Sequence, residues 1–120
     1  MRSILIVDDQ AGIRLLLSEV FQNEGLTTYT ASNGLEALRI FEEKQLDCIL
    51  LDIKMPGMDG IEILNKIRKT NEYIPVYMMT AYGEKDLIDS ANKLNVVKFF
   101  TKPFNIFEVR DSVLDLLLQK

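Results

Sequence analysis

Residues 3–9 of the chain read SILIVDD, an apolar run that stops against two adjacent carboxylates. Ser3–Val7 lacks the alternation of polar and apolar residues typical of a half-exposed strand, so it predicts a strand covered on both faces, as in a parallel sheet. Asp8 and Asp9 follow at once, although like charges repel each other and ionised groups are costly near a core. The stretch therefore predicts a buried strand that presents two acidic groups at its end.

Four more short apolar or β-branched runs follow along the chain, at residues 27–31, 48–51, 75–79 and 97–101. A helical pattern comes after each run, and this alternation of strand and helix is typical of an α/β fold. The first helix carries an apolar stripe and is closed by Gly25 at a C′ position. The stripe consists of Ile13, Leu16, Leu17, Val20 and Phe21.

Start signals for the later helices vary in strength. Asn33 and Asp59 are suited to cap the second and third helices. The fourth helix, at about residues 84–94, has the weakest pattern because the stretch is short and polar. The fifth is expected to begin near Asn105 or Ile106 and to continue to the end of the chain.

The composition excludes several classes of function. The 120 residues form one expected domain, 1–120, and the net charge of −4 argues against nucleic acid as a direct partner. There is no signal-peptide pattern, and no apolar run approaches the ~20 residues that span a bilayer. A single cysteine, Cys48, favours the cytoplasm. Histidine is absent, which excludes Ser-His-Asp triads, His-ligated zinc and a phosphohistidine on this chain.

Polar side chains follow four of the five predicted strands. Asp8 and Asp9 follow the first strand, Asp52 the third, Thr80 the fourth and Lys102 the fifth. In open parallel sheets, binding sites form outside the carboxyl ends of the strands, so these five residues are expected to converge. Three carboxylates would raise a pKa among them unless a cation were present. An all-oxygen set of this kind is what Mg²⁺ prefers.

This arrangement suits phosphoryl transfer to a carboxylate. Asp52 is the best nucleophile because it stands alone after a central strand, whereas Asp8 and Asp9 form a natural metal-holding pair. Lys102 and the metal would neutralise charge on the phosphoryl oxygens, and Thr80 would donate a hydrogen bond. The predicted product is an aspartyl phosphate.

Simpler interpretations exist for each residue taken alone. Asp8 and Asp9 are also suited to a solvated strand end with a helix N-cap, and Asp52 to a turn before Pro56. Two other protein classes are alternatives to this interpretation. Haloacid-dehalogenase-like phosphatases need Asp-x-Asp after the first strand, and cofactor-binding flavodoxin-like proteins need a glycine-rich phosphate loop there. The chain has Asp-Asp-Gln-Ala at that place, so both classes are disfavoured.

Four stretches in this order, ILIVDD, LLDIKMPGMDG, MMTAYG and FFTKPF, closely resemble the receiver domain of bacterial two-component response regulators. The resemblance covers the whole chain. It implies a flavodoxin-like, doubly wound (βα)5 three-layer sandwich with a five-stranded parallel sheet in the order 2-1-3-4-5. It also implies a Mg²⁺ site in which Asp9 is a direct ligand, Asp8 acts through water, and Asp52 and the backbone carbonyl of Lys54 contribute.

The resemblance assigns further roles. Asp52 would be the phosphoacceptor, and Thr80 and Lys102 would contact the phosphoryl group. Pro103 would follow a cis peptide bond, which X–Pro permits. Phe99 occupies the aromatic switch position, where a phenylalanine has to act by packing alone.

A closer resemblance is to the stand-alone receivers of the sporulation phosphorelay, and Gln10, Lys54 and Tyr82 fit that group. Phe99 departs from it, because those receivers have a histidine there. Leu15 lies opposite the apolar stripe of its helix at ~100° per residue, so we predict a docking surface of Leu15, Ile13 and Ile106.

The function expected from this resemblance is that of a relay receiver without an output domain. It would take a phosphoryl group from a sensor histidine kinase and pass it to a four-helix-bundle histidine phosphotransferase, with an aspartyl-phosphate phosphatase as a further partner. The alternative is a switch-type receiver that binds a target protein when phosphorylated and does not relay phosphate.

Overall fold

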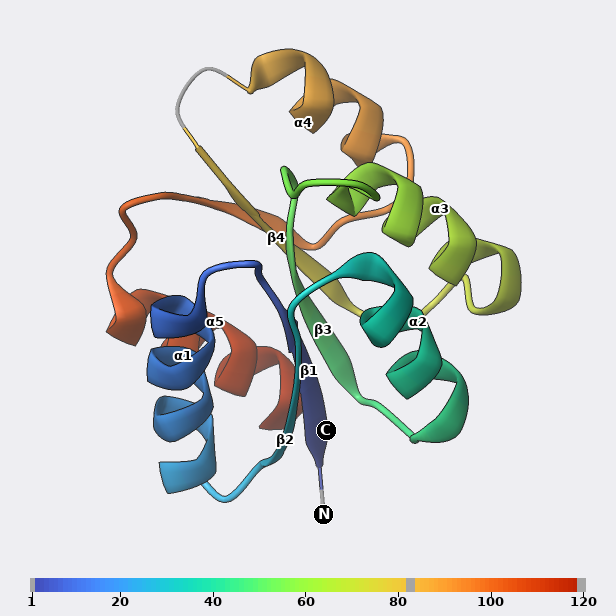
Figure 1. Cartoon of the computed structure of the whole chain (residues 1–120). Helices are drawn as coiled ribbons and strands as arrows, with labels where there is room; N and C mark the ends of the chain where they lie inside the picture. The colour runs from blue at the N-terminus through green and yellow to red at the C-terminus, as the bar shows by residue number, and fades with distance from the viewer. Residues whose placement is uncertain (1, 82–83, 119–120) are drawn as a thin grey trace.

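The computed structural model describes residues 2–81 and 84–118, in which five strands alternate with five helices (Figure 1). All neighbouring strands pair in parallel, in the order β2-β1-β3-β4-β5. The predicted flavodoxin-like α/β fold and its strand order are confirmed. The elements are β1 (Ser3–Val7), α1 (Ala11–Asn23), β2 (Thr27–Ala31), α2 (Gly34–Glu43), β3 (Cys48–Asp52), α3 (Gly60–Thr70), β4 (Val76–Thr80), α4 (Lys85–Asn92), β5 (Lys98–Thr101) and α5 (Ile106–Leu118).

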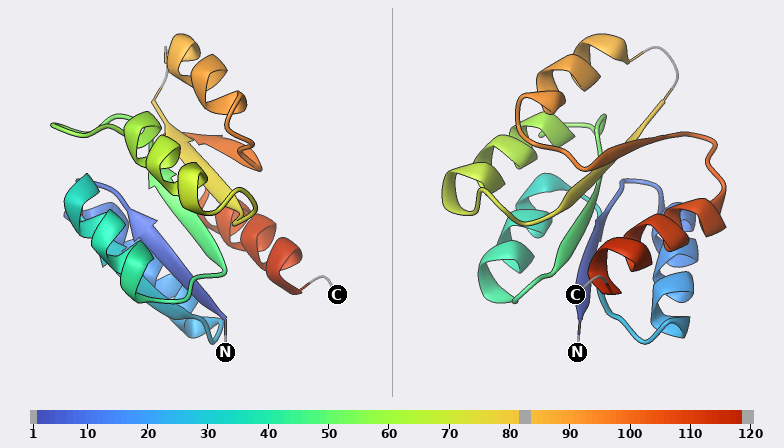
Figure 2. Two further views of the ribbon diagram at one scale, coloured as in Figure 1. Left: turned by 90° about the vertical axis from the view of Figure 1, so that its right-hand side faces the viewer. Right: turned by 180° about the vertical axis from the view of Figure 1, so that it is seen from behind.

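The sheet is the middle of three layers, because each of its faces is covered by helices. Helices α1 and α5 lie side by side on one face, and α2, α3 and α4 cover the other (Figure 2). The side chains on the two faces of β1 belong to separate hydrophobic cores. Leu5 and Val7 pack with α2 and α3, whereas Ile4 and Ile6 pack with α1 and α5. This double coverage explains why every residue of β1, β3 and β4 is buried.

The predicted helix signals are mostly confirmed. The side chain of Asn33 accepts a hydrogen bond from the Glu36 amide (2.9 Å), and Asp59 does the same for Glu62 (3.0 Å). Gly25 has φ +88°, the left-handed conformation that ends a helix at least cost for glycine. Helix α4 is shorter than predicted and spans Lys85–Asn92.

Part of the predicted stripe on α1 is wrong. Leu17 and Phe21 are buried and Ile13 packs against their core, but Leu16 is 50% exposed. At ~100° per residue Leu16 lies at the margin of the stripe, beyond the reach of the sheet. Leu15 is 64% exposed, as its place opposite the stripe predicts.

Candidate functional site

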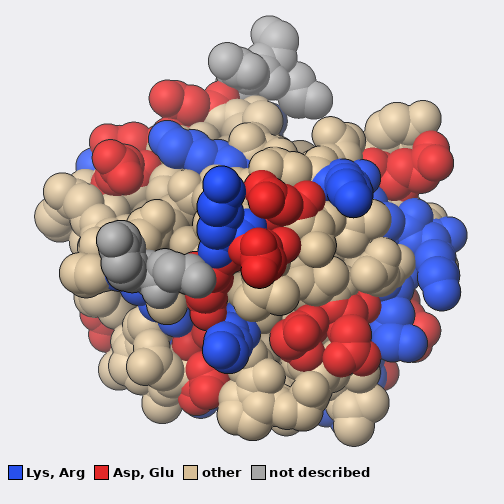
Figure 3. Space-filling model, turned by 90° about the horizontal axis from the view of Figure 1, so that it is seen from above, with Lys and Arg blue, Asp and Glu red and all other residues tan. Residues whose placement is uncertain are grey.

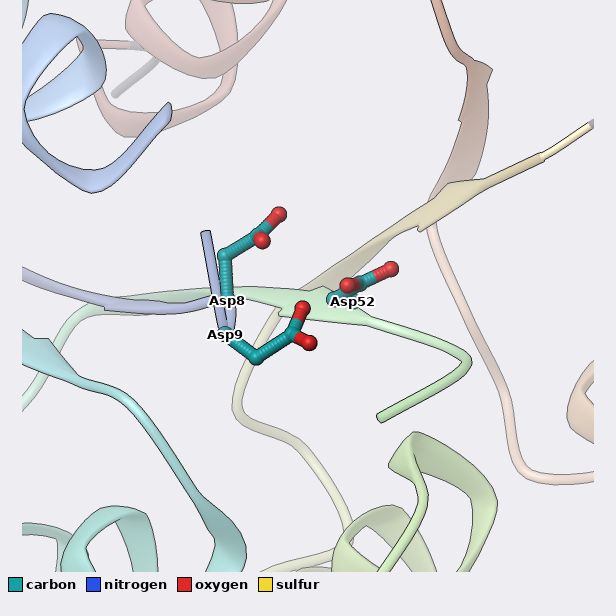
Figure 4. A group of neighbouring side chains, drawn as sticks. All are labelled: Asp8, Asp9 and Asp52. Carbon is teal, nitrogen blue, oxygen red and sulfur yellow. The ribbon is translucent and has the colours of Figure 1, made fainter. Parts of the chain in front are cut away.

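Three carboxylates meet where β1 and β3 end. The two strands are neighbours in register, with Val7 beside Leu51, so Asp8 and Asp9 emerge next to Asp52. One carboxylate oxygen from each of the three residues lies within 4.8 Å of the others. Figure 4 shows the three side chains around one region at the ends of these strands. The predicted convergence of the acidic residues is therefore present in the structure.

Lys102, which follows the edge strand β5, links two of the carboxylates. Its Nζ donates to Asp8 Oδ2 at 2.9 Å and lies 3.3 Å from Asp52 Oδ2. Burial by itself lowers the pKa of Lys102, but the hydrogen bond to Asp8 and the charge of Asp52 together raise it above its ordinary value. Lys102 is therefore a permanent positive charge at the cluster. Figure 3 shows this end of the molecule, where acidic and basic side chains lie next to each other.

Asp8 and Asp9 have different surroundings. Asp8 is fully buried, and the backbone N–H of Gln10 donates to its second oxygen, Oδ1, at 2.9 Å. Asp9 is exposed, and within residues 2–81 and 84–118 its carboxylate has no hydrogen-bond or ion-pair partner. The N-cap of α1 is Gln10, so the simpler interpretation of the acidic pair as a helix cap is wrong.

Burial disfavours the ionised form of Asp52 in this cluster. Burial first, and then the charge of Asp8, raise the pKa of Asp52 to about 6, although Lys102 opposes the shift. The single positive charge of Lys102 thus does not balance the negative charge of three carboxylates. The site is therefore suited to bind a cation as well. The donors are all oxygen, so a hard divalent ion suits them better than one that seeks sulfur or imidazole.

Thr80 ends β4 and is 1% exposed. Among the described residues its Oγ1 is the one buried side-chain polar atom without a hydrogen-bond partner. This hydroxyl is therefore available to donate to an oxygen that enters the site.

A depression of about 300 Å³ lies over the cluster and gives a ligand access to it. Two of the three acidic residues of the cluster line it, together with Lys102 and residues that follow β1, β3 and β4. The lining residues are Asp9, Gln10, Asp52, Lys54, Ala81, Glu84 and Lys102. A small anion that entered would meet Asp52 and Lys102 together.

The sequence matches the model of the response regulator receiver domain over residues 4–114. The chain belongs to the response regulator receiver family. It is 54% identical over 110 residues to sporulation initiation phosphotransferase F of Bacillus subtilis, a match covering 92% of this chain and 89% of that protein. It is also 33% identical to the chemotaxis protein CheY of Halobacterium salinarum, over 97% of each chain.

Solved receiver structures agree with the fold. A CheY-like receiver domain protein from Methanospirillum hungatei superposes with a TM-score of 0.92 at 26% identity, over 98% of this chain and 94% of that one. CheY4 of Vibrio cholerae gives 0.88 at 27% identity, over 96% and 98% of the two chains. Other relatives are longer: the receiver spans 24% of the regulatory protein AtoC of Escherichia coli.

The residues predicted for switching and docking lie in different places. Phe99 on β5 pairs with Met78 and is half-buried against the core under α2, α3 and α4. Ile13 and Ile106 are half-buried on the opposite face of the sheet, and Leu15 is exposed on α1. Their docking role stays a prediction.

Two further predicted positions concern loops. The bond between Lys102 and Pro103 is cis, as the resemblance implied. Tyr82 lies outside the described residues. In the described part of the receiver, no helix is long and apolar enough to cross a membrane.

One residue at the site was missed from the sequence. The sequence pattern places Glu84 only at the start of the fourth helix, but its side chain lines the depression and accepts a hydrogen bond from the backbone N–H of Ala81 at 2.7 Å. Its spacing of four residues from Thr80 was the available signal. That spacing does not reveal which backbone donor the Glu84 carboxylate accepts from.

The raised pKa of Asp52 predicts a stabilising substitution. Because the folded-state pKa lies above the ordinary 3.8, the folded protein binds more protons between about pH 4 and 6, and its stability falls as pH rises through that window. Without divalent cations at pH 7, Asp52→Asn is expected to raise the free energy of unfolding by about 2 kcal/mol. Urea denaturation in a chelating buffer measures this change.

Asp89→Asn on the exposed side of α4 is the control and should leave stability nearly unchanged. The gain for Asp52→Asn should shrink toward pH 4, where the wild-type carboxyl is already protonated. If Asp52→Asn were no more stable than wild type at pH 7, the ionised Asp52 carboxylate would not destabilise the folded protein.

Proposed function

We propose that this receiver is a phosphorelay carrier: it accepts a phosphoryl group on Asp52 and passes it to a histidine of another protein. The depression in which Asp52 meets Lys102 is the observation that carries the proposal, because it joins a nucleophile to a fixed positive charge. The identity of 54% to a phosphotransferase named for sporulation initiation supports the relay and its sporulation context.

In the proposed reaction, an oxygen of the Asp52 carboxylate attacks the phosphorus of a phosphohistidine on a sensor kinase. The new O–P bond forms as the P–N bond breaks, and the imidazole nitrogen keeps the electron pair and takes up a proton. Lys102 neutralises charge on the phosphoryl oxygens, and Thr80 Oγ1, which has no partner among the described residues, donates to one of them. Transfer to the next histidine reverses these bond changes.

We propose Mg²⁺ as the cation of the acidic cluster. Asp9 and Asp52 would hold it directly with the backbone carbonyl of Lys54, and Asp8, whose two oxygens are engaged by Lys102 and Gln10, would act through water. The bound ion supplies positive charge for the transferring phosphoryl oxygens. Oxygen ligands and a net negative pocket support this choice.

Phosphotransfer distinguishes the relay from a switch that only binds a target. The receiver is phosphorylated with labelled phosphodonor and Mg²⁺, freed of donor, and mixed with histidine phosphotransferases of the source organism. A relay moves label to at least one phosphotransferase within minutes, and not to a variant whose acceptor histidine is replaced by alanine. Label that stays on the receiver with every phosphotransferase, and is lost only to water, would favour the switch.

Several parts of the proposal go beyond the catalytic centre. A sensor histidine kinase, a four-helix-bundle phosphotransferase and an aspartyl-phosphate phosphatase are the proposed partners, with Leu15, Ile13 and Ile106 as contact residues. The cytoplasm is the proposed location and stays a prediction.

A further inference from the structure

Glu84 uses its side chain in an unusual way for a residue that begins a helix. It is the N-cap residue of α4, yet it makes no side-chain capping bond to that helix. Its Oε1 instead accepts from the backbone N–H of Ala81 at 2.7 Å. Both residues line the depression together with Asp52 and Lys102. A fourth carboxylate thus sits at a site that is already acidic.

The Ala81 N–H is a donor of the kind that phosphoryl groups use. It directly follows Thr80 and lies at the same depression as Lys102. A phosphoryl group on Asp52 would bring three acceptor oxygens, and backbone amides at the ends of elements are favourable partners for them. Lys102 Nζ and Thr80 Oγ1 are two candidate donors, and the Ala81 amide is the third. In the unphosphorylated structure this third donor already donates its hydrogen bond to the Glu84 carboxylate.

We propose that Glu84 is an internal competitor of the phosphoryl group for the Ala81 N–H. In the unphosphorylated protein its carboxylate occupies that amide and adds negative charge where an anionic donor must enter. Phosphorylation of Asp52 displaces the carboxylate, since the phosphoryl oxygen takes the amide. The displacement reaches α4 directly because Glu84 is its N-cap residue. This inference rests on the proposed function, and it assigns Glu84 the role of a positioning residue that couples Asp52 to α4.

A simpler interpretation is that the bond closes the short loop between β4 and α4 and has no effect on phosphorylation. The two interpretations differ in their kinetics. If Glu84 only closes the loop, its removal loosens α4 and leaves the phosphorylation rate unchanged or lower. If it competes, its removal frees a donor, lowers the negative charge of the entrance and raises the rate.

Phosphorylation by acetyl phosphate with Mg²⁺ tests the competition without a kinase. An Asp52 oxygen forms the new O–P bond, the bond from phosphorus to the acetate oxygen breaks, and acetate leaves with the electron pair. Intact-mass measurement gives the initial rate. We expect Glu84→Ala to react about three- to tenfold faster than wild type, a change of the size that one typical hydrogen bond makes in a free energy. Glu84→Gln should fall between, since the amide carbonyl still accepts but carries no charge.

Asp86→Asn is the matched control. Asp86 is exposed in the first turn of α4, so the substitution removes one negative charge from the same helix end without touching the depression. Its rate should equal that of wild type. Equal rates for wild type and Glu84→Ala, or equal acceleration in Glu84→Ala and Asp86→Asn, would overturn the competition.

The amide resonance of Ala81 gives a readout independent of turnover. Without phosphate, Glu84→Ala should move the Ala81 proton upfield of wild type, because the carboxylate acceptor is lost. With beryllofluoride as a phosphoryl mimic, the two proteins should show the same Ala81 resonance. If wild type takes no phosphoryl group at all, the proposed function fails, and the Ala81 resonances still decide whether Glu84 holds this amide. If the Ala81 amide proton had the same chemical shift in Glu84→Ala and in wild type, the hydrogen bond from Ala81 to Glu84 would be refuted.

Discussion

Lys102→Met is expected to slow the phosphorylation of Asp52 roughly a hundredfold or more. The Lys102 Nζ lies 2.9 Å from Asp8 Oδ2 and 3.3 Å from Asp52 Oδ2, so its positive charge is next to the phosphoacceptor. Methionine keeps most of the length of the side chain but provides neither charge nor donor. Negative charge on the transferring phosphoryl oxygens then depends on the metal and Thr80 alone. The rate with acetyl phosphate and Mg²⁺, followed by intact mass, measures the loss.

The same substitution should also destabilise the fold. Asp8 is fully buried, so losing its partner leaves an uncompensated carboxylate, at a cost of about 3 kcal/mol without divalent cations. Mg²⁺ should recover part of this loss. Lys98→Met on the same strand, β5, is the control because Lys98 is exposed and remote from the acids. If Lys102→Met were phosphorylated at the rate of Lys98→Met, Lys102 would have no part in the reaction.

Gly60→Ala is expected to lower the free energy of unfolding by about 3 kcal/mol or more. Gly60 begins α3, and its backbone N–H donates to the Ile53 carbonyl at 2.6 Å. A Cβ at this position would overlap the carbonyl oxygen of Asp52 and lie 2.8 Å from Ile53 Cα. Backbone atoms cannot rotate aside as a side chain does. The gain of about 1 kcal/mol in helix propensity from glycine to alanine is too small to compensate.

Gly34→Ala makes a matched control, because Gly34 begins α2 just as Gly60 begins α3. Its added Cβ would meet Met58 at Sδ (2.8 Å) and at Cβ (2.9 Å), so Met58 has to shift, but none of these contacts is with a backbone atom. Urea denaturation should therefore show a smaller loss for Gly34→Ala than for Gly60→Ala. Equal losses in the two variants would mean that the approach of α3 to the Asp52 backbone is not tight.

The strand ends were predictable because one physical rule governs them. Parallel strands present their carboxyl ends at a single edge, so the residues after the apolar runs had to meet. Asp8, Asp52 and Lys102 confirm this placement. Helix caps were equally local: Asn33 and Asp59 bond amides three residues away.

Features that depend on the path of a loop or on a close approach in space were not predictable. The hydrogen bond from the Ala81 amide to the Glu84 side chain joins two residues on either side of positions 82–83, and no periodicity of the sequence encodes it. The tight approach of Gly60 to Asp52 joins a helix start to a strand end through long-range packing. Leu16 fits the apolar stripe by spacing, yet the sheet does not reach its side of α1.

The most direct test of the central claim identifies the residue that carries the phosphoryl group. The protein is phosphorylated with acetyl phosphate and Mg²⁺ and reduced with borohydride, which converts an aspartyl phosphate to homoserine, and its peptides are sequenced by mass spectrometry. The account predicts homoserine at position 52 in wild type, and none in Asp52→Asn. Homoserine at position 8 or 9, or a phosphate that resists reduction on a hydroxyl such as that of Thr80, would contradict it.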